Sequence, residues 1–596
     1  MSHSLHLMGK LLYVSLFVTI QVAALIVMFL FFRDQFAYFY IFCMLLSLGA
    51  SIHILNNTTS NPAYKIAWLI PILLFPIFGG LLYLLFGKYR MTRKQRASSR
   101  AIRKQIATVM ESEHIAADHL ETLPPDAAIQ ARYLLRASGS PPCVHTQTEY
   151  LPIGEAFFDA LLRELETAES FIFLEYFIVE EGTMWNSILE VLERKIKQGV
   201  EVRLMYDDLG CLLTLPRHYD RVLRAKGLRV CVFNPFNSVL SPRFNNRDHR
   251  KICIIDGKIG FTGGINLADE YINAYAKHGH WKDTGVCLRG SAVWSMTVQY
   301  LALWGFTSGQ VDSFSRYCPP AAWVESIAPD GVVLPYTDLP LDDDLVGETA
   351  YLNMIHRAKK YVYITTPYLI IDNEMMTSLC TAAKAGIDVR IITPHIPDKK
   401  TVFFLTRSYY EPLQKAGVHI YEYTPGFIHA KTMVCDDEYA IVGTINLDYR
   451  SLYLHLEDAV WMYRSSAVSD VKQDFLRTQE MSQEMHPGDL GRIGWLKQLW
   501  LGILHAVAPL VWLLCTAGPF VPSHRLWPLC QSPHSKKADA SSWRDVRFSY
   551  AKILALSDPP PGGHRTPAHQ IRGYFPGSDP PRRRGRSLVC PEAPPV

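Results

Sequence analysis

Two stretches of this 596-residue chain repeat one set of chemically active side chains at one spacing. Each set contains a histidine, a lysine, an aspartate, a glycine and an asparagine, in that order. The members are His249, Lys251, Asp256, Gly263 and Asn266 in the first copy and His429, Lys431, Asp436, Gly443 and Asn446 in the second. The intervals are two, five, seven and three residues in both copies, which lie 180 positions apart. Such a match indicates a duplicated site.

The residue types in each copy suit attack on a phosphodiester. A neutral imidazole can attack phosphorus, and a second, protonated imidazole can donate to the departing alkoxide. Lysine ammoniums and asparagine amides can hold the nonbridging oxygens and their growing charge. One histidine in each copy would give one nucleophile and one acid. We expect no metal and no cofactor, because the lysines provide the positive charge and no carboxylate cluster is present to bind an ion.

Each copy is expected to be a strand with its chemistry at one edge. A histidine and a lysine two residues apart on a strand share a face. The apolar runs Ile252–Ile255 and Thr432–Cys435 have the length of a strand buried on both faces. Asp256 and Asp436 then fall at turns. We place them in the catalytic set as structural or charge partners, not as proton carriers.

Two small or polar residues follow each return strand, and all four are expected to bind the substrate phosphate. Asn266 and Asn446 would offer carboxamides to the phosphate oxygens. Gly264 would let a substrate oxygen approach the backbone. Thr444, at the same position in the second copy, would offer a hydroxyl, so the two halves are not equivalent.

Strand-like and helix-like segments alternate around both motifs in the same order. This pattern predicts two pseudo-symmetric α/β sandwich lobes preceded by N-terminal transmembrane helices. The motifs must meet face to face across a pseudo-twofold interface, so neither lobe should work alone. We expect a membrane anchor at 1–90, a basic segment and loosely packed connector at 91–145, lobes at 146–322 and 323–490, an interfacial amphipathic helix at 491–516 and a disordered tail at 517–596.

Three apolar runs near the N-terminus approach the ~20 residues that cross a bilayer. They are Leu11–Phe32, Phe36–Leu55 and Ala67–Phe86; two or three spans are expected, with a cleaved signal sequence as the alternative for the first. Lys88–Lys104 follows with eight basic residues and no acid. The positive-inside bias therefore predicts a multi-pass protein of the cell membrane with its catalytic lobes in the cytoplasm.

The cysteines and the overall charge point to fewer conclusions. The 12 cysteines form no CxxC pair, which favours buried free thiols in a reducing compartment. A net charge of +4 says little about partners. Nothing resembles a nucleic-acid groove, so we expect no nucleic-acid partner. The oligomeric state is open.

The two His-x-Lys-x4-Asp motifs, with their Gly-Gly-x-Asn and Gly-Thr-x-Asn tails, resemble those of the phospholipase D superfamily. More narrowly, the chain resembles the bacterial cardiolipin synthases of that superfamily. The stretches that carry this resemblance are 246–251, 366–368, 427–431, 446–451 and the N-terminal segment 68–87. The resemblance implies transfer of a phosphatidyl group between two phosphatidylglycerol molecules, giving cardiolipin and glycerol through a phosphatidyl-histidine.

The resemblance also implies roles for single residues. His249 would be the nucleophile and His429 the acid and then the base, although the reverse assignment stays open. Glu457 and Asp283 each lie near the start of a later strand and could hydrogen-bond a motif histidine. In the family such an acid orients the imidazole and fixes its tautomer. His280, His356, His395, His419 and His455 lack the motif context, and we expect them to be ordinary surface or strand residues.

Four other functions are compatible with parts of the pattern. A hydrolytic phospholipase D would use the same residues with water as acceptor, and another phospholipid could serve as donor; the motifs do not choose among these. A membrane anchor favours transfer, because it holds the site against a pool of acceptor lipid. A nuclease would have little use for such an anchor, and an inactive scaffold would have no reason to keep both imidazoles and both ammoniums.

Overall fold

The computed structural model describes residues 33–57, 61–74, 117–235, 246–310, 312–339, 344–491 and 494–508, with isolated residues between 19 and 110. The chain divides into one unit of Met1–Phe520 and another of Val521–Val596, and the described residues all belong to the first. The predicted tail at 517–596 therefore lies outside the described residues. So does the first predicted span, Leu11–Phe32, apart from isolated positions.

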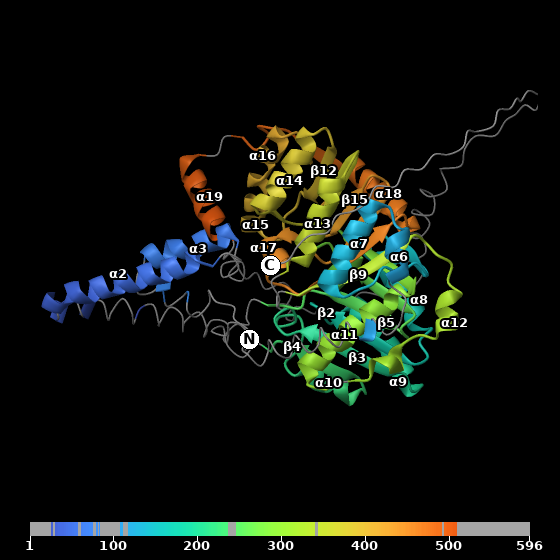
Figure 1. The fold of residues 1–596 in the computed structure, drawn as a ribbon. Helices are drawn as coiled ribbons and strands as arrows, with labels where there is room; N and C mark the ends of the chain where they lie inside the picture. The colour runs from blue at the N-terminus through green and yellow to red at the C-terminus, as the bar shows by residue number, and fades with distance from the viewer. Residues whose placement is uncertain are drawn as a thin grey trace, which may run out of the picture. The chain divides into compact units, whose positions relative to one another are not determined.

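The first lobe is a mixed seven-stranded sheet of order β1-β8-β6-β5-β2-β3-β4. Its strands are β1 (Thr146–Leu151), β2 (Phe171–Tyr176), β3 (Glu201–Asp207), β4 (Arg229–Phe233), β5 (Lys251–Ile255), β6 (Ile259–Gly263) and β8 (Gly285–Gly290). β2, β3 and β4 run parallel, and the remaining pairs are antiparallel. The strands alternate with α8 (Gly154–Leu165), α9 (Thr183–Lys197) and α10 (Tyr219–Ala225), as the sequence pattern predicts (Figure 1).

The second lobe repeats this sheet and adds one edge strand, in the order β19-β13-β12-β10-β15-β16-β18-β9. Its strands are β9 (Val332–Asp338), β10 (Tyr361–Thr365), β12 (Asp388–Pro394), β13 (His419–Tyr423), β15 (Thr432–Cys435), β16 (Tyr439–Gly443), β18 (Glu457–Tyr463) and β19 (Ser482–Met485). The two sheets correspond strand by strand, and each pair of neighbours is parallel or antiparallel in both. The order β4-β3-β2-β5-β6-β8-β1 in the first lobe corresponds to β13-β12-β10-β15-β16-β18-β9 in the second. The predicted pair of pseudo-symmetric α/β lobes is confirmed.

Each sheet separates an outer core from a core that both lobes share. The outer helices are α8, α9 and α10 on the first sheet and α13 (Val346–Arg357), α14 (Asn373–Lys384) and α16 (Tyr410–Lys415) on the second. The shared core contains α11 (Ala292–Ser308) and α18 (Ser466–Glu480), with inward residues of both sheets. Two short strands, β7 (His280–Lys282) and β14 (Gly426–Ile428), also pair across the lobes. Separating the lobes would expose this core, so they form one structural unit.

Each motif strand is the first arm of a tight hairpin. β5 turns into β6 through Asp256 and Gly257, and β15 turns into β16 through Asp436 and Asp437. These residues have φ angles of 54°, 66°, 57° and 61°, the left-handed conformation of a type I′ turn. The turn closes the end of the strand that lies away from the histidine and the lysine.

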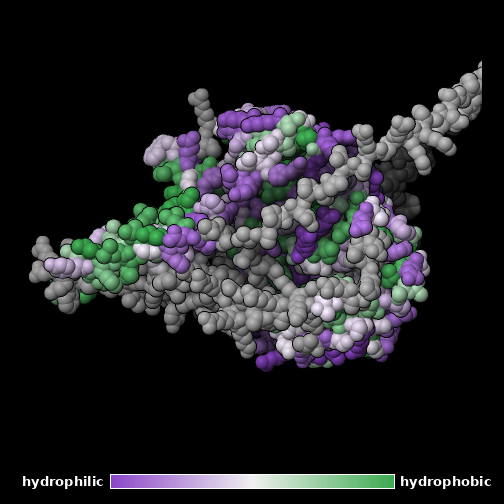
Figure 2. All heavy atoms as spheres, viewed as in Figure 1, coloured by the Kyte–Doolittle hydropathy of each residue, from purple (hydrophilic) through white to green (hydrophobic). Residues whose placement is uncertain are grey.

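Two apolar helices precede the lobes. α2 (Arg33–Leu55) corresponds to the second predicted span, and its Ala37–Leu55 stretch is the single helix in the described part of the chain with the length and composition to cross a membrane. α3 (Pro62–Leu74) covers the described start of the third predicted span and is shorter. Large apolar side chains are exposed along both helices, more of them on α2 than on α3 (Figure 2).

The connector before the first lobe packs more tightly than the sequence indicates. It contains α6 (Ala117–Thr122) and α7 (Pro125–Ser138). α7 buries Ala127, Ala131 and Leu134 in the outer core of the second lobe, against β9 and α13. Its buried Gln130 accepts a hydrogen bond from the indole of Trp461 at 3.1 Å. The prediction of loose packing was wrong for α7, because its alanines let the helix lie close to the sheet.

Cysteine chemistry agrees with the sequence interpretation. All nine cysteines in the described part of the chain are free thiols, and seven of them are buried. Cys253 and Cys435 lie inside the motif strands and pack as small apolar residues.

Candidate active site

Both motif histidines lie at the seam between the lobes, because the main chain of each is bonded to the other lobe. The N–H of His429, which follows β14, donates to the carbonyl of Lys282 in β7 at 2.7 Å. The N–H of His249, which precedes β5, donates to the carbonyl of Leu456 at 2.9 Å, just before β18. The backbone of one lobe thus fixes the histidine of the other.

A carboxylate from the opposite lobe holds each imidazole. Nδ1 of His249 lies 2.9 Å from Oε2 of Glu457, and Nδ1 of His429 lies 2.6 Å from Oδ2 of Asp283. Both carboxylates are fully buried. An ionised carboxylate only accepts hydrogen bonds, so each Nδ1 carries the hydrogen and each Nε2 presents a lone pair. The structure therefore brings both predicted acids to motif histidines, in a crossed arrangement that the sequence did not indicate.

The two motif lysines are buried directly beside the histidines. Nζ of Lys251 donates to the carbonyl of His249 at 2.5 Å. Nζ of Lys431 donates to the carbonyl of His429. It also lies 2.7 Å from Nδ1 of His429, but that nitrogen donates to Asp283 and so cannot accept from the lysine. Burial lowers the pKa of Lys251 to about 8 and that of Lys431 to about 7. Burial deprives both ammoniums of water, and an anion bound in the site would stabilise their charged forms.

The same burial keeps both imidazoles neutral near pH 7. Burial, then the charges of Lys251 and Lys431, hold the pKa of His249 well below its ordinary value. Burial and Lys431 lower the pKa of His429 to about 4, against the opposing effect of Asp283. The site has neutral nitrogen nucleophiles surrounded by positive charge, which suits a negatively charged electrophile such as a phosphodiester.

One cavity of about 410 Å³ is lined by both motif histidines. Aromatic side chains form much of its wall: Phe177, Tyr271, Trp281, Tyr368 and Tyr449. Charged side chains also line it: Glu270, Lys277, Asp398, Lys399, Asp448 and Arg450. The central expectation from the sequence, that the two imidazoles converge on one site, agrees with this geometry.

The two motif asparagines line the cavity but differ in availability. Oδ1 of Asn266 accepts the N–H of Ile178 at 3.0 Å, and its Nδ2 donates to the hydroxyl of Tyr271 at 2.6 Å. Its carboxamide is therefore engaged within the first lobe. Oδ1 of Asn446 is buried with no hydrogen-bond partner among the described residues. Because a carboxamide oxygen accepts, Asn446 is the better placed of the two to receive a hydroxyl group of a ligand.

Gly264 and Thr444 support the carboxylates instead of facing the cavity. A Cβ at Gly264 would lie 2.0 Å from Oδ1 of Asp283, so only glycine leaves room for that carboxylate. The hydroxyl of the fully buried Thr444 donates to Glu457. The structure corrects the expectation that Gly264 and Thr444 bind the phosphate. Each lies against the buried acid of its own lobe, Asp283 and Glu457 respectively.

Asp256 and Asp436 lie at the far ends of the motif strands and bind backbone. The Asp256 carboxylate accepts the N–H groups of residues 169, 170 and 171 at 2.8, 2.8 and 2.7 Å. The Asp436 carboxylate accepts those of residues 359, 360 and 361 at 2.6, 2.8 and 2.9 Å. They fasten the start of β2 and β10 to the hairpin turns, which agrees with the structural role that we expected for them, although they were placed in the catalytic set.

Replacing Asp436 by alanine is expected to destabilise the protein without impairing the chemistry. Three backbone donors lose their acceptor, which should lower the free energy of unfolding by about 1–3 kcal/mol. Thermal unfolding in detergent measures this, with activity recorded per folded protein at a permissive temperature. Glu411→Ala, which removes one exposed i,i+4 pair with Lys415, is the matched control and should change little. Lost activity with unchanged stability would return Asp436 to the catalytic set.

His455 is a site residue that the sequence reasoning missed. Its ring centroid lies 5.3 Å from that of His249, it lines the cavity, and its Nδ1 is 3.5 Å from Oε1 of Glu457. Burial and Arg450 lower its pKa to about 3. One feature of the sequence could have identified it. His455 lies two residues before Glu457, as Trp281 lies two residues before Asp283, and both line the cavity. The expectation that His455 is an ordinary strand residue was wrong.

The other flagged histidines do not line the cavity. Their partners are Tyr423 for His280, Ser378 for His356, Glu422 for His395 and Glu484 for His419.

By distance, three described residues could hold a divalent cation. The ligand atoms of His249, His455 and Glu457 lie within 4.8 Å of one another. Lys251, Lys431 and Arg450 surround this group, as their lowering of the imidazole pKa values shows. Their positive charge opposes a cation there.

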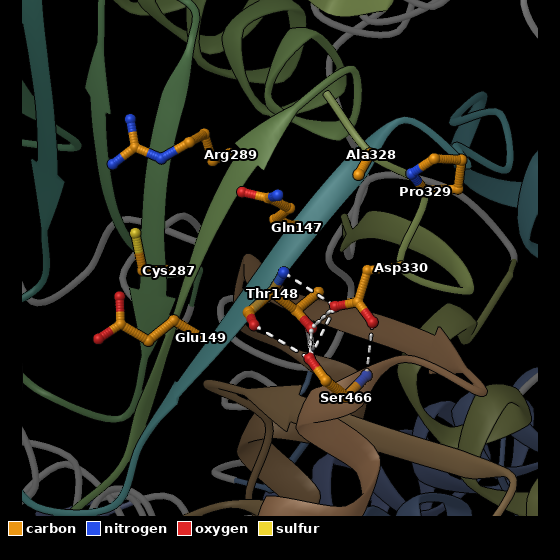
Figure 3. A pocket seen from close by; sticks show the side chains of 9 residues that line it. All are labelled: Gln147, Thr148, Glu149, Cys287, Arg289, Ala328, Pro329, Asp330 and Ser466. Atoms are coloured by element: carbon orange, nitrogen blue, oxygen red, sulfur yellow. Dashed lines mark hydrogen bonds between the residues drawn. The ribbon is translucent and has the colours of Figure 1, made fainter. Parts of the chain in front are cut away.

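A second cavity, of about 380 Å³, contains no motif residue. Asp330 accepts hydrogen bonds there from the N–H and hydroxyl of Thr148 at 3.1 and 2.6 Å, and from the N–H and hydroxyl of Ser466 at 2.7 and 2.8 Å (Figure 3). Because Thr148 belongs to β1 and Ser466 begins α18, this cluster fastens the first sheet to the shared helix. Its contacts are structural.

The fold and the seam together define a class of protein: a two-lobed α/β enzyme with one histidine–lysine motif in each lobe and one site between them. Residues 161–276 and 351–479 match the family model described as cardiolipin synthase, phospholipase D-like domain. Residues 45–88 match the model described as phospholipase D-nuclease N-terminal.

Full-length relatives agree with these matches. An uncharacterized protein of Streptococcus mutans is 42% identical over 475 residues, covering 78% of this chain and 100% of that protein. Cardiolipin synthases of Geobacillus kaustophilus and Alkalihalophilus pseudofirmus are 36% and 34% identical, covering 73% and 72% of this chain and 86% and 84% of theirs. The chain belongs to the cardiolipin synthase family of the phospholipase D superfamily.

Proposed function

We propose that this protein is a membrane-associated cardiolipin synthase that transfers a phosphatidyl group from one phosphatidylglycerol to another and releases glycerol. The observation that carries the proposal is the crossed seam: two imidazoles from opposite lobes line one cavity, and each has its Nδ1 on a buried carboxylate of the other lobe. That geometry leaves two Nε2 atoms for one nucleophilic and one proton-transfer role.

In the first half-reaction Nε2 of His249 attacks phosphorus and the bond from phosphorus to the glycerol oxygen breaks. His429, which takes up a proton at Nε2 as the phosphodiester binds, gives that proton to the glycerol oxygen, and glycerol leaves. In the second half-reaction a hydroxyl of another phosphatidylglycerol gives its proton to His429, its oxygen attacks phosphorus, and the bond to His249 breaks. Lys251 and Lys431 hold the charge on the nonbridging oxygens throughout.

Electrostatics support His249 as the nucleophile. Every large influence on its pKa acts downward: burial, Lys251, Lys431, His429 and Arg450. His429 instead receives an upward influence from Asp283, through both charge and hydrogen bond. The proton required for the leaving group is therefore more stable on His429. A bound phosphodiester adds negative charge between the lysines and raises the proton affinity of His429 further.

Transfer rather than hydrolysis is favoured by the membrane-associated part of the chain. A helix able to cross a bilayer lies in the same structural unit as the site. Such an anchor presents the site to a high local density of acceptor lipid. We further propose a multi-pass anchor with the lobes in the cytoplasm, supported by the basic run Lys88–Lys104.

Incubation with phosphatidylglycerol labelled in its headgroup glycerol and its acyl chains tests the function. We expect labelled cardiolipin and free glycerol in equal amounts, resolved by chromatography and mass spectrometry. Phosphatidic acid as the main product would identify a hydrolase instead. Phosphatidylethanolamine offered in place of the donor tests whether another phospholipid can serve. A chelator should leave the rate unchanged, and restoration of a lost rate by one divalent ion would assign a metal to the site.

The pH dependence should report the buried lysines. Their charged forms bind the phosphate, and their pKa values are about 8 and about 7 in the empty site. As the pH rises through these values the free enzyme loses the positive charge that attracts the substrate. We therefore expect kcat/KM to fall on the alkaline side with an apparent pKa between them. The phosphodiester does not titrate in this range, so a profile that is flat to about pH 9 would contradict this account.

A further inference from the structure

One side of the catalytic cavity is apolar and belongs to elements that also contact the membrane-associated helices. Val402 and Leu405 lie on α15 (Lys400–Ser408), three residues apart on one helix face, and both line the cavity. Tyr449 of α17 (Tyr449–Tyr453) and Ala508 also line it. Val402 and Leu405 are buried, and neither takes part in the chemistry proposed above.

α15 begins near the catalytic histidines. The residue pair Asp398 and Lys399 directly precedes it, and both line the cavity. Asp398 accepts a hydrogen bond from the hydroxyl of Tyr368 at 2.6 Å. The ring of Tyr368 packs on Phe427, two residues before His429, with centroids 6.5 Å apart. The start of α15 thus lies beside the phosphate site and is charged.

α15 ends against α19 (Trp495–Val507). The hydroxyl of Ser408 lies 2.9 Å from Nε2 of His505, and the ring of Tyr409 packs on the same imidazole. α19 in turn contacts α3. α15 therefore connects the cavity to α19, which contacts α3 and carries exposed apolar surface. Its apolar residues Val402–Leu405 lie in the middle of the helix, between Lys400 at its start and Arg407 in its last turn.

α17 makes a parallel connection to the anchor. Its first residue, Tyr449, lines the cavity, and the hydroxyl of its last residue, Tyr453, accepts a hydrogen bond from Asn61 at 2.8 Å. Asn61 directly precedes α3 and also donates to Asp372 at 3.1 Å. The N-terminal helices are thus fixed to the part of the second lobe that forms the apolar side of the cavity.

α19 exposes one apolar face beside these contacts. Trp495, Leu496, Leu499, Trp500 and Ile503 are 71%, 62%, 58%, 49% and 45% exposed, at spacings that place them on one side of the helix. Thirteen residues rise about 20 Å, less than the ~30 Å of a bilayer core, so α19 fits the interface rather than a span. Tryptophans favour that interface.

We propose that Val402, Leu405 and Tyr449 form a groove through which the acyl chains of the donor phospholipid reach from the bilayer to the catalytic histidines. This rests on the proposed phosphatidyl transfer and adds where the hydrophobic part of the substrate lies. The phosphate sits between the histidines, and the chains run along α15 toward α19 and α3. The charged residues at the start of α15 stay with the polar headgroup.

Tryptophan at Leu405 or at Val402 tests the groove by filling it. The full-length protein is assayed with long-chain phosphatidylglycerol in mixed micelles and with water-soluble dihexanoyl phosphatidylglycerol. We expect kcat/KM for the long-chain lipid to fall about tenfold or more and that for the short-chain lipid to change much less. The control is Thr401→Trp, at an exposed neighbouring position on the same helix that does not line the cavity. Equal losses on both lipids, or no loss on either, would overturn the groove.

Cross-linking of the unaltered protein covers the case in which the tryptophan variants do not fold. Phosphatidylglycerol with a photoreactive acyl chain should label peptides of α15, α17 or the end of α19. Labelling confined to other cavity elements would overturn the proposal. Wild-type protein that makes no cardiolipin from either lipid would instead refute the proposed function, while the labelling pattern would still report the groove.

Discussion

His249→Ala is expected to reduce cardiolipin synthesis to background, and His429→Ala to lower it by about 10²–10⁴-fold. The first variant loses the atom that forms the covalent bond, and the second loses the proton donor for glycerol. The assay is conversion of labelled phosphatidylglycerol by protein purified in detergent. His419→Ala, which removes an exposed imidazole that pairs with Glu484, is the control and should retain activity.

An activated donor separates the two roles. A p-nitrophenyl ester of phosphatidic acid has a leaving group that needs no proton, so release of p-nitrophenol should recover in His429→Ala and stay absent in His249→Ala. In His429→Ala the phosphatidyl-histidine should also accumulate, because the second alcohol lacks its base. Recovery in His249→Ala alone would reverse the assignment. Substantial cardiolipin synthesis by both variants would refute the two-histidine mechanism.

Glu457→Gln and Asp283→Asn should each cost about 10²–10⁴-fold in kcat/KM while leaving the protein folded. A carboxamide can donate as well as accept, so it no longer forces the hydrogen onto Nδ1 of the facing imidazole. Because the acids are crossed, Glu457→Gln should impair His249 and remain slow with the activated donor. Asp283→Asn should impair His429 and recover with it.

The matched control for these acids is Glu484→Gln, which alters a histidine–glutamate pair at 2.9 Å far from the cavity. It should leave kcat/KM within about twofold, since exposed pairs contribute little. If Glu457→Gln behaved like His429→Ala with the activated donor, each acid would serve its own lobe in solution and the crossed geometry would be wrong.

The local pattern around His249 and His429 was sufficient to predict the motif strands, their hairpins and the pairing of two lobes. Those features depend on neighbours in sequence: alternation, buried apolar runs and turn residues. The motif spacing also led to the two lysines beside the histidines. The sequence pattern could not predict which residues of distant strands lie opposite one another, within a lobe or across the two lobes. The local sequence of one strand contains no information on its distant partner.

The errors in the site follow from pairings between distant parts of the chain, some within one lobe and some across the two lobes. From the sequence, Thr444 was predicted to bind phosphate, but the fold places Glu457 beside it. His455 was predicted to be an ordinary strand residue, but the fold places its ring against His249. Asp256 and Asp436 share the motif spacing with the catalytic residues, yet a strand separates them from the chemistry. A repeated spacing indicates that all residues of the motif are needed. Only the fold distinguishes those needed for the chemistry from those needed for the structure.

Because both lobes belong to one polypeptide, the two halves of the site can differ in sequence. In a symmetric homodimer the two halves would have to be identical. In a dimer of single lobes, the two faces of the site would be copies and neither imidazole could be favoured for one step. Here the positions diverge as Asp283 against Glu457, Gly264 against Thr444 and Trp281 against His455. Covalent fusion therefore permits a division of labour, in which one half specialises in bonding to phosphorus and the other in moving protons.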